Sequence, residues 1–124
     1  MNISSSTPNP QVNVLLVELL SSSKSILGNL FVGMYLSGSL AIGDFDDDSD
    51  VDFIFIIKDK VSDVQLLALQ EMHVRIHNID SKWATCLEGY YIPQGELQHY
   101  NADDAWHLYL DNGSSELVVV KDNQ

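Results

Sequence analysis

The chain has 124 residues, the length of one globular domain whose core is large enough to fold without disulfides. Its formal net charge is −12, from 18 acidic and 6 basic residues, which argues against a protein that binds the phosphate backbone of nucleic acids. A single cysteine excludes an internal disulfide, and no apolar stretch is long enough to cross a membrane. We therefore expect a cytoplasmic protein whose ligands are cations, either Mg²⁺ or a polyamine-like substrate.

The first third of the chain predicts a polar leader, a helix and a strand. Residues 1–9 are polar, and from Val12 to Leu27 apolar residues recur at helical spacing. Pro10 suits the first turn of this helix and Gly28 suits its end. The following stretch, 30–36, is short, apolar and flanked by glycines, which indicates a strand.

The middle of the chain predicts a strand, a helix and another strand. Residues 51–57, "VDFIFII", are rich in β-branched and aromatic side chains and indicate a buried strand. Ser62 and Gln65 form a plausible capping box for a helix that runs to about His77. Residues 81–92 alternate well enough to predict a third strand, which Pro93 would end.

The last part of the chain predicts a hairpin, because Asn112-Gly113 lies between two strand-like runs. Strands interleaved with helices and followed by a hairpin indicate an α/β (α+β) fold. We predict one domain over residues 1–124, in which helices pack against a mixed β-sheet.

An acidic cluster precedes the second predicted strand, with six aspartates in the nine positions from Asp44 to Asp52. Asp50 and Asp52 are two residues apart at the entry of the strand, so their side chains leave the same face. Carboxylate oxygens are the ligands that Mg²⁺ prefers, together with water and substrate phosphates. The pattern therefore predicts a metal and nucleotide site at this edge of the sheet.

A Gly-Ser pair follows the first predicted strand and fits the same site. Gly38 allows a ligand to approach the backbone, and Ser39 offers a hydroxyl at the N-terminus of a predicted short helix, where free N–H groups attract phosphate. Ser39 could also simply cap that helix.

The stretch "GSLAIGDFDDDSDVDFIFI" resembles the signature of nucleotidyltransferases of the DNA polymerase beta superfamily, in which Gly-Ser precedes Asp-x-Asp by about ten residues. "CLEGYYIP" and "HLYLDNGSSELVVV" are similar to the middle of bacterial adenylyltransferases that modify streptomycin or spectinomycin. The resemblance extends from about Phe31 to the end of the chain. The second, helical domain of those enzymes is not expected in these 124 residues.

This resemblance implies a role for each motif residue. Asp50, Asp52 and Glu88 would bind Mg²⁺ in a site of the two-metal type, and Glu88 would either complete that site or deprotonate the attacking hydroxyl. The resemblance assigns nucleotide binding to a further set of small residues, namely Gly38, Ser39 and Ser49. The expected reaction is transfer of a nucleoside monophosphate from ATP to a hydroxyl of a small, cationic acceptor. Asp44 and Asp46 to Asp48 would lie on the rim and attract that acceptor.

Other interpretations of these residues remain open. The chain could be a minimal nucleotidyltransferase of a toxin and antitoxin pair, with a helical partner protein or a homodimer, or a non-catalytic remnant of the fold. Glu88 could be an ordinary strand residue. A calcium loop beginning at Asp44 is excluded, because Ser49 and Phe55 stand where glycine and glutamate are required. Cys86 is expected to be a buried strand residue, and the histidines are expected at the surface: His73, His77, His99 and His107.

Overall fold

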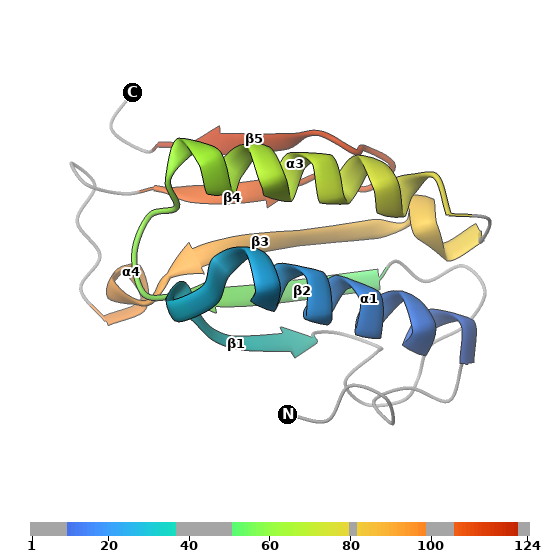
Figure 1. The fold of residues 1–124 in the computed structure, drawn as a ribbon, viewed down its shortest axis with the longest axis horizontal. Helices are drawn as coiled ribbons and strands as arrows, with labels where there is room; N and C mark the ends of the chain where they lie inside the picture. Colours follow the sequence, from blue (N-terminus) through green and yellow to red (C-terminus); the bar gives the residue numbers. More distant parts are fainter. Residues whose placement is uncertain (1–9, 37–50, 80–81, 99–105, 122–124) are drawn as a thin grey trace.

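A computed structural model describes residues 10–36, 51–79, 82–98 and 106–121 of the protein. These residues form a five-stranded mixed sheet with two long helices packed against it, which confirms the predicted fold class (Figure 1). None of the helices in these ranges is both long and apolar enough to span a membrane.

The strands lie in the sheet in the order in which they follow one another along the chain. The two central neighbours, β2 and β3, are parallel, and all other neighbouring pairs are antiparallel. A parallel pair needs a crossover connection, and helix α3 provides it between β2 and β3. The strands are β1 (Phe31–Leu36), β2 (Val51–Ile57), β3 (Leu87–Pro93), β4 (His107–Leu110) and β5 (Leu117–Val120).

Both long helices cover the same face of the sheet (Figure 1). Helix α1 (Pro10–Leu27) begins at Pro10, as predicted, and continues into the short 3₁₀ segment η2 (Gly28–Leu30). Helix α3 (Asp63–His77) begins with the predicted capping box. In this capping box the Gln65 N–H donates to the Ser62 hydroxyl at 3.1 Å, and the Ser62 N–H donates to the Gln65 side-chain oxygen at 2.9 Å. Helix α4 (Gln94–Gln98) is a short turn after β3.

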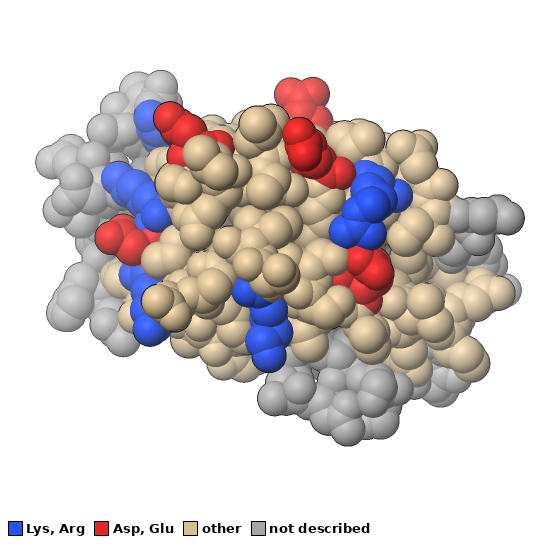
Figure 2. Space-filling view, viewed as in Figure 1, with Lys and Arg blue, Asp and Glu red and all other residues tan. Residues whose placement is uncertain are grey.

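The core lies between the two helices and the strand residues that face them. Along β2 and β3 the side chains alternate, so that one set faces the helices and the other set faces away. The largest fully buried side chains include Trp83, Tyr91, Phe53 and Phe55. Figure 2 views the molecule from the helical side, where the described basic side chains are separated by acidic and uncharged ones.

A buried polar chain links α1, β3 and α3 inside this core. Nε2 of His73 lies 2.7 Å from the Tyr91 hydroxyl, which lies 3.4 Å from the Ser23 hydroxyl. The prediction that His73 lies at the surface is wrong, because only 2% of its surface is exposed. Burial lowers the pKa of His73 from 6.5 to about 3, since a charged imidazole would lose its hydration.

Three further details differ from the prediction. Residues 82–85 form a 3₁₀ segment, η3 (Lys82–Thr85), and β3 begins only at Leu87. Cys86 therefore precedes the strand, and its side chain is partly exposed instead of buried. The predicted hairpin is present, but its connection spans residues 111–116, and within this connection Gly113 has a positive φ, of 85°.

Candidate active site

Two of the predicted site residues, Asp52 and Glu88, lie side by side on the central parallel strands. Asp52 on β2 is the register partner of Glu88 on β3, so both side chains leave the same face of the sheet. This face is the one opposite the helices, and we call it the carboxylate face. Both residues are half-buried and line a pocket of about 220 Å³ together with Ile54 and Tyr90.

The other predicted site residues lie outside the described residues. They comprise Gly38, Ser39, Asp44, Asp46 to Asp48, Ser49 and Asp50. Because the described part of β2 begins at Val51, the next residue after Asp50, the predicted pairing of Asp50 with Asp52 stays a prediction. Glu88 is thus the only expected partner of Asp52 whose position is described here.

The glycine next to Glu88 lies tightly against the neighbouring strand β2. A Cβ atom at Gly89 would meet the carbonyl oxygen of its register partner Phe53 and would lie 2.6 Å from Cδ1 of the Phe53 ring. Phe53 is buried, and one of these atoms belongs to its backbone, so neither can move aside without a shift of the packed core. Gly89 is therefore required by the close approach of β3 to the Phe53 backbone and ring.

A tyrosine that is not among the predicted site residues reaches the same site. The Tyr109 hydroxyl on β4 donates to Oε2 of Glu88 at 2.8 Å and lies 3.0 Å from Oδ1 of Asp111. The pKa of Tyr109 is raised, mainly by the hydrogen bond to Glu88 and to a smaller extent by the one to Asp111, because a phenolate would face two carboxylates. The sequence offers one signal, for the contact with Asp111 only: Tyr109 and Asp111 are two residues apart, which places both side chains on one face of an extended chain.

Aromatic rings continue the carboxylate face beside Glu88. Tyr90 and Tyr109 are register partners, and the centroids of their rings lie 4.9 Å apart. The centroid of the His107 ring lies 5.7 Å from that of the Tyr90 ring. Tyr90 is 38% exposed, so part of its ring is available to a ligand. The carboxylates are thus bordered by a partly exposed aromatic surface.

The chemistry of the donors fits a divalent cation. Asp52 and Glu88 present carboxylate oxygens to one pocket, and Mg²⁺ is commonly bound through one or two carboxylates plus substrate phosphates. Within the described ranges, three or more His, Cys, Asp or Glu side chains nowhere come together as a metal-binding group. Two carboxylates are too few to enclose a metal ion by themselves. They suit a Mg²⁺ site in which the phosphates of a nucleotide supply further ligands.

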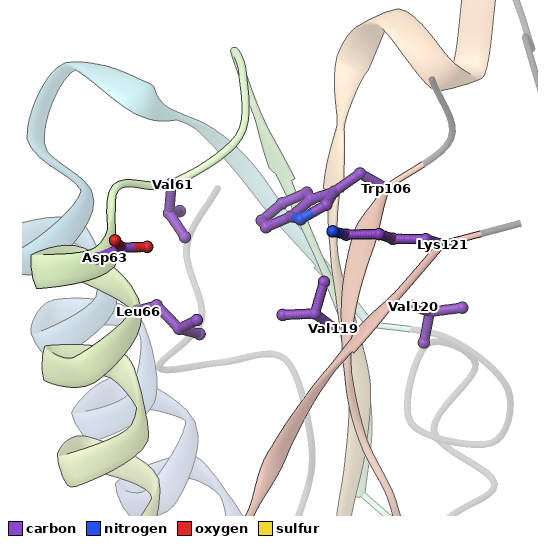
Figure 3. Close-up of a pocket in the computed structure, with 7 residues that line it drawn as sticks. All are labelled: Val61, Asp63, Leu66, Trp106, Val119, Val120 and Lys121. Carbon is purple, nitrogen blue, oxygen red and sulfur yellow. The ribbon is translucent and has the colours of Figure 1, made fainter. Parts of the chain in front are cut away.

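A larger pocket, of about 640 Å³, lies at the opposite end of the sheet and is shown in Figure 3. Asp63 at the start of α3 stands on one side of it, while Trp106 and Lys121 stand on the other. The other described residues that line it are apolar, namely Val61, Leu66, Val119 and Val120. Among the described lining residues there is one carboxylate and one ammonium group, and not the pair of acids that metal-assisted chemistry uses.

A comparison with known protein families covers the strands that carry the smaller pocket. The family model described as "Nucleotidyltransferase domain" matches residues 18–92, a range that contains β2, all of β3 except Pro93, and every described residue lining the pocket beside Asp52 and Glu88. Comparison with proteins of curated function finds no match. Because the family model covers more than half of the chain, this protein belongs to the nucleotidyltransferase domain family of the DNA polymerase beta superfamily.

Proposed function

We propose that the chain is a Mg²⁺-dependent nucleotidyltransferase that transfers AMP from ATP to a hydroxyl group of a small cationic acceptor, such as an aminoglycoside. The observation that carries this proposal is the register pair of Asp52 and Glu88 on adjacent parallel strands inside the family match. The surplus of acidic over basic residues supports a cationic acceptor, since opposite charge attracts such a molecule to the site.

The proposed chemistry divides between the carboxylates. Asp50 and Asp52 would hold Mg²⁺, which when bound neutralises charge on the phosphates. The acceptor oxygen forms a bond to the α-phosphorus while the bond from this phosphorus to the bridging oxygen breaks, and pyrophosphate leaves with the electron pair. Glu88, which lines the same pocket as Asp52, either takes the proton of the acceptor hydroxyl or completes the metal site.

The first test is a thermal melt of the purified chain with and without ATP and Mg²⁺. A ligand at a hundred times its dissociation constant stabilises the native state by about 2.7 kcal/mol, so an upward shift of the melting temperature is expected. The shift should require both ATP and Mg²⁺, and the double variant Asp50→Asn, Asp52→Asn should lose it. Asp59→Asn, which removes an exposed carboxylate just after β2, is the matched control and should keep it.

The second test is pyrophosphate release from ATP in the presence of Mg²⁺ and a panel of aminoglycosides. Turnover that depends on the acceptor and disappears in Asp52→Asn would support the proposal. Absence of both a ligand-induced shift and turnover would instead favour a non-catalytic remnant of the fold. A shift with ATP but no turnover with any aminoglycoside would refute the proposed acceptor while retaining the nucleotide site.

A further inference from the structure

We propose that Tyr109 is a positioning residue that holds the Glu88 carboxylate in one orientation for nucleotidyl transfer, an inference that rests on the proposed function. The carrying observation is the 2.8 Å hydrogen bond from the Tyr109 hydroxyl to Oε2 of Glu88. Tyr109 lies on β4, beyond the end of the family match at residue 92, so the match assigns it no role.

The sheet places the Tyr109 hydroxyl beside Glu88 through backbone pairing. Tyr109 is the direct register partner of Tyr90, which is two residues after Glu88 on β3. Glu88 is therefore a diagonal neighbour of Tyr109 on the same face, a separation that a long aromatic side chain spans. The tilted contact with the Tyr90 ring, at 4.9 Å between centroids, restrains the Tyr109 ring from its other side.

The hairpin turn after β4 fixes the second partner of the hydroxyl. Oδ1 of Asp111 lies 3.0 Å from the Tyr109 hydroxyl and also accepts the Asn112 N–H at 2.9 Å. The Asp111 carbonyl accepts the Ser114 N–H at 3.0 Å, which closes the turn. Asp111 is thus held by its own turn, so the Tyr109 hydroxyl has a second carboxylate acceptor at a fixed position beside Glu88.

This arrangement has a consequence for the free oxygen of Glu88. A glutamate side chain has three rotatable bonds and can adopt many conformations. A donor that is hydrogen-bonded to Oε2 restricts the side chain to the conformations that keep this bond. The hydroxyl thereby directs Oε1 to a constant place, where it can meet a metal ion or the proton of an acceptor. Catalytic groups must be held to within a fraction of an ångström, and supporting hydrogen bonds normally provide that restraint.

The test compares Tyr109→Phe, which keeps the ring and removes the hydroxyl, with Tyr35→Phe as the matched control. Tyr35 on β1 is another tyrosine of the carboxylate face, is 54% exposed, and does not line the pocket of Asp52 and Glu88. Thermal melts of both variants first establish that each remains folded.

The first readout needs no activity and uses NMR of the glutamate carboxyl carbons at one fixed pH. The Glu88 resonance is identified by its loss in Glu88→Gln. We expect Tyr109→Phe to move this resonance and Tyr35→Phe to leave it in place. An unmoved Glu88 resonance in Tyr109→Phe overturns the proposal, whatever the activity of the protein.

The second readout separates kcat from KM for ATP in the pyrophosphate assay. Loss of a supporting hydrogen bond to a site residue typically reduces activity by about 10-fold to 100-fold, and we expect that loss in kcat with little change in KM. In the Glu88→Gln background, Tyr109→Phe should not lower kcat any further. If Tyr109→Phe moves the Glu88 resonance but leaves kcat unchanged, the proposed positioning role is refuted. A wild-type chain that shows neither the ligand-induced melting shift nor pyrophosphate release refutes the proposed function, and the NMR result then decides alone whether Tyr109 orients Glu88.

Discussion

The buried His73 makes the stability of this protein sensitive to mild acid, and the structure gives the size of the effect. In the unfolded chain the imidazole binds a proton near pH 6.5, whereas in the folded chain its pKa is lowered to about 3 by burial. Below pH 6.5 the unfolded state therefore binds more protons than the native state, so the free energy of unfolding falls as the pH falls. The limiting slope is about 1.4 kcal/mol per pH unit, and between about pH 7 and about pH 5 the loss is about 2 kcal/mol.

The assay is urea unfolding followed by far-ultraviolet circular dichroism at several values between about pH 7 and about pH 5, with linear extrapolation to water. The variant is His73→Gln, whose neutral amide keeps a polar group near the Tyr91 hydroxyl and does not titrate. The difference between wild type and variant isolates His73, because all carboxylates are common to both. His77→Gln is the matched control, since it removes an imidazole from the same helix at a position that is not buried.

We expect His73→Gln to lose less stability than the wild type on acidification, by about 2 kcal/mol over this interval, and His77→Gln to follow the wild type more closely. Parallel pH dependences in the wild type and His73→Gln would refute the reasoning, because they would show that His73 takes up its proton without unfolding. The absolute stability of His73→Gln at about pH 7 does not enter this comparison.

Two further predictions concern the elements that place the site. Gly89→Ala should lower the free energy of unfolding by about 1 to 3 kcal/mol, since its Cβ would overlap the Phe53 backbone and ring. An unchanged midpoint of urea unfolding would contradict this prediction, because it would show that β2 and β3 separate easily. Ser62→Ala should lower the free energy of unfolding by about 1 kcal/mol in the same assay, because it removes the capping box of α3. The control is Ser25→Ala, which changes an exposed serine inside α1. Equal effects of the two changes would contradict the capping role.

The elements with strong local signals were predicted well from the sequence. The apolar run of β2 and the capping box at Ser62 are each specified by adjacent residues, and both are confirmed. The structure starts β3 later than the sequence predicts, because the pattern of "SKWATC" resembles the alternation of a strand. Trp83 and Ala84 are both buried, and neighbouring residues of a regular strand cannot both face the same side.

His73 was misplaced although the sequence carries a signal for its burial. Leu69, Met72 and Ile76 are buried on α3, and His73 falls on the same stripe, one turn after Leu69. Its polar partner in the core is the Tyr91 hydroxyl on strand β3, which helical periodicity does not reveal.

The candidate site was predictable only in part, because it is assembled by strand register. The Asp-x-Asp motif identifies Asp52, but the position of Glu88 beside it follows from a parallel pairing that a whole crossover helix sets. Tyr109 escaped the sequence analysis for a similar reason, since its contact with Glu88 depends on the register of β4 against β3.

The parallel pairing of β2 with β3 also bears on how fast the chain folds. Asp52 and Glu88 are separated by the whole of α3 in sequence, so their strands meet only after a long loop has closed. Closing that loop brings two like charges together at the centre of the sheet, which opposes the pairing step when the ionic strength is low. The refolding rate should therefore rise with added monovalent salt, and Glu88→Gln should fold faster than the wild type at low salt and gain less from its addition.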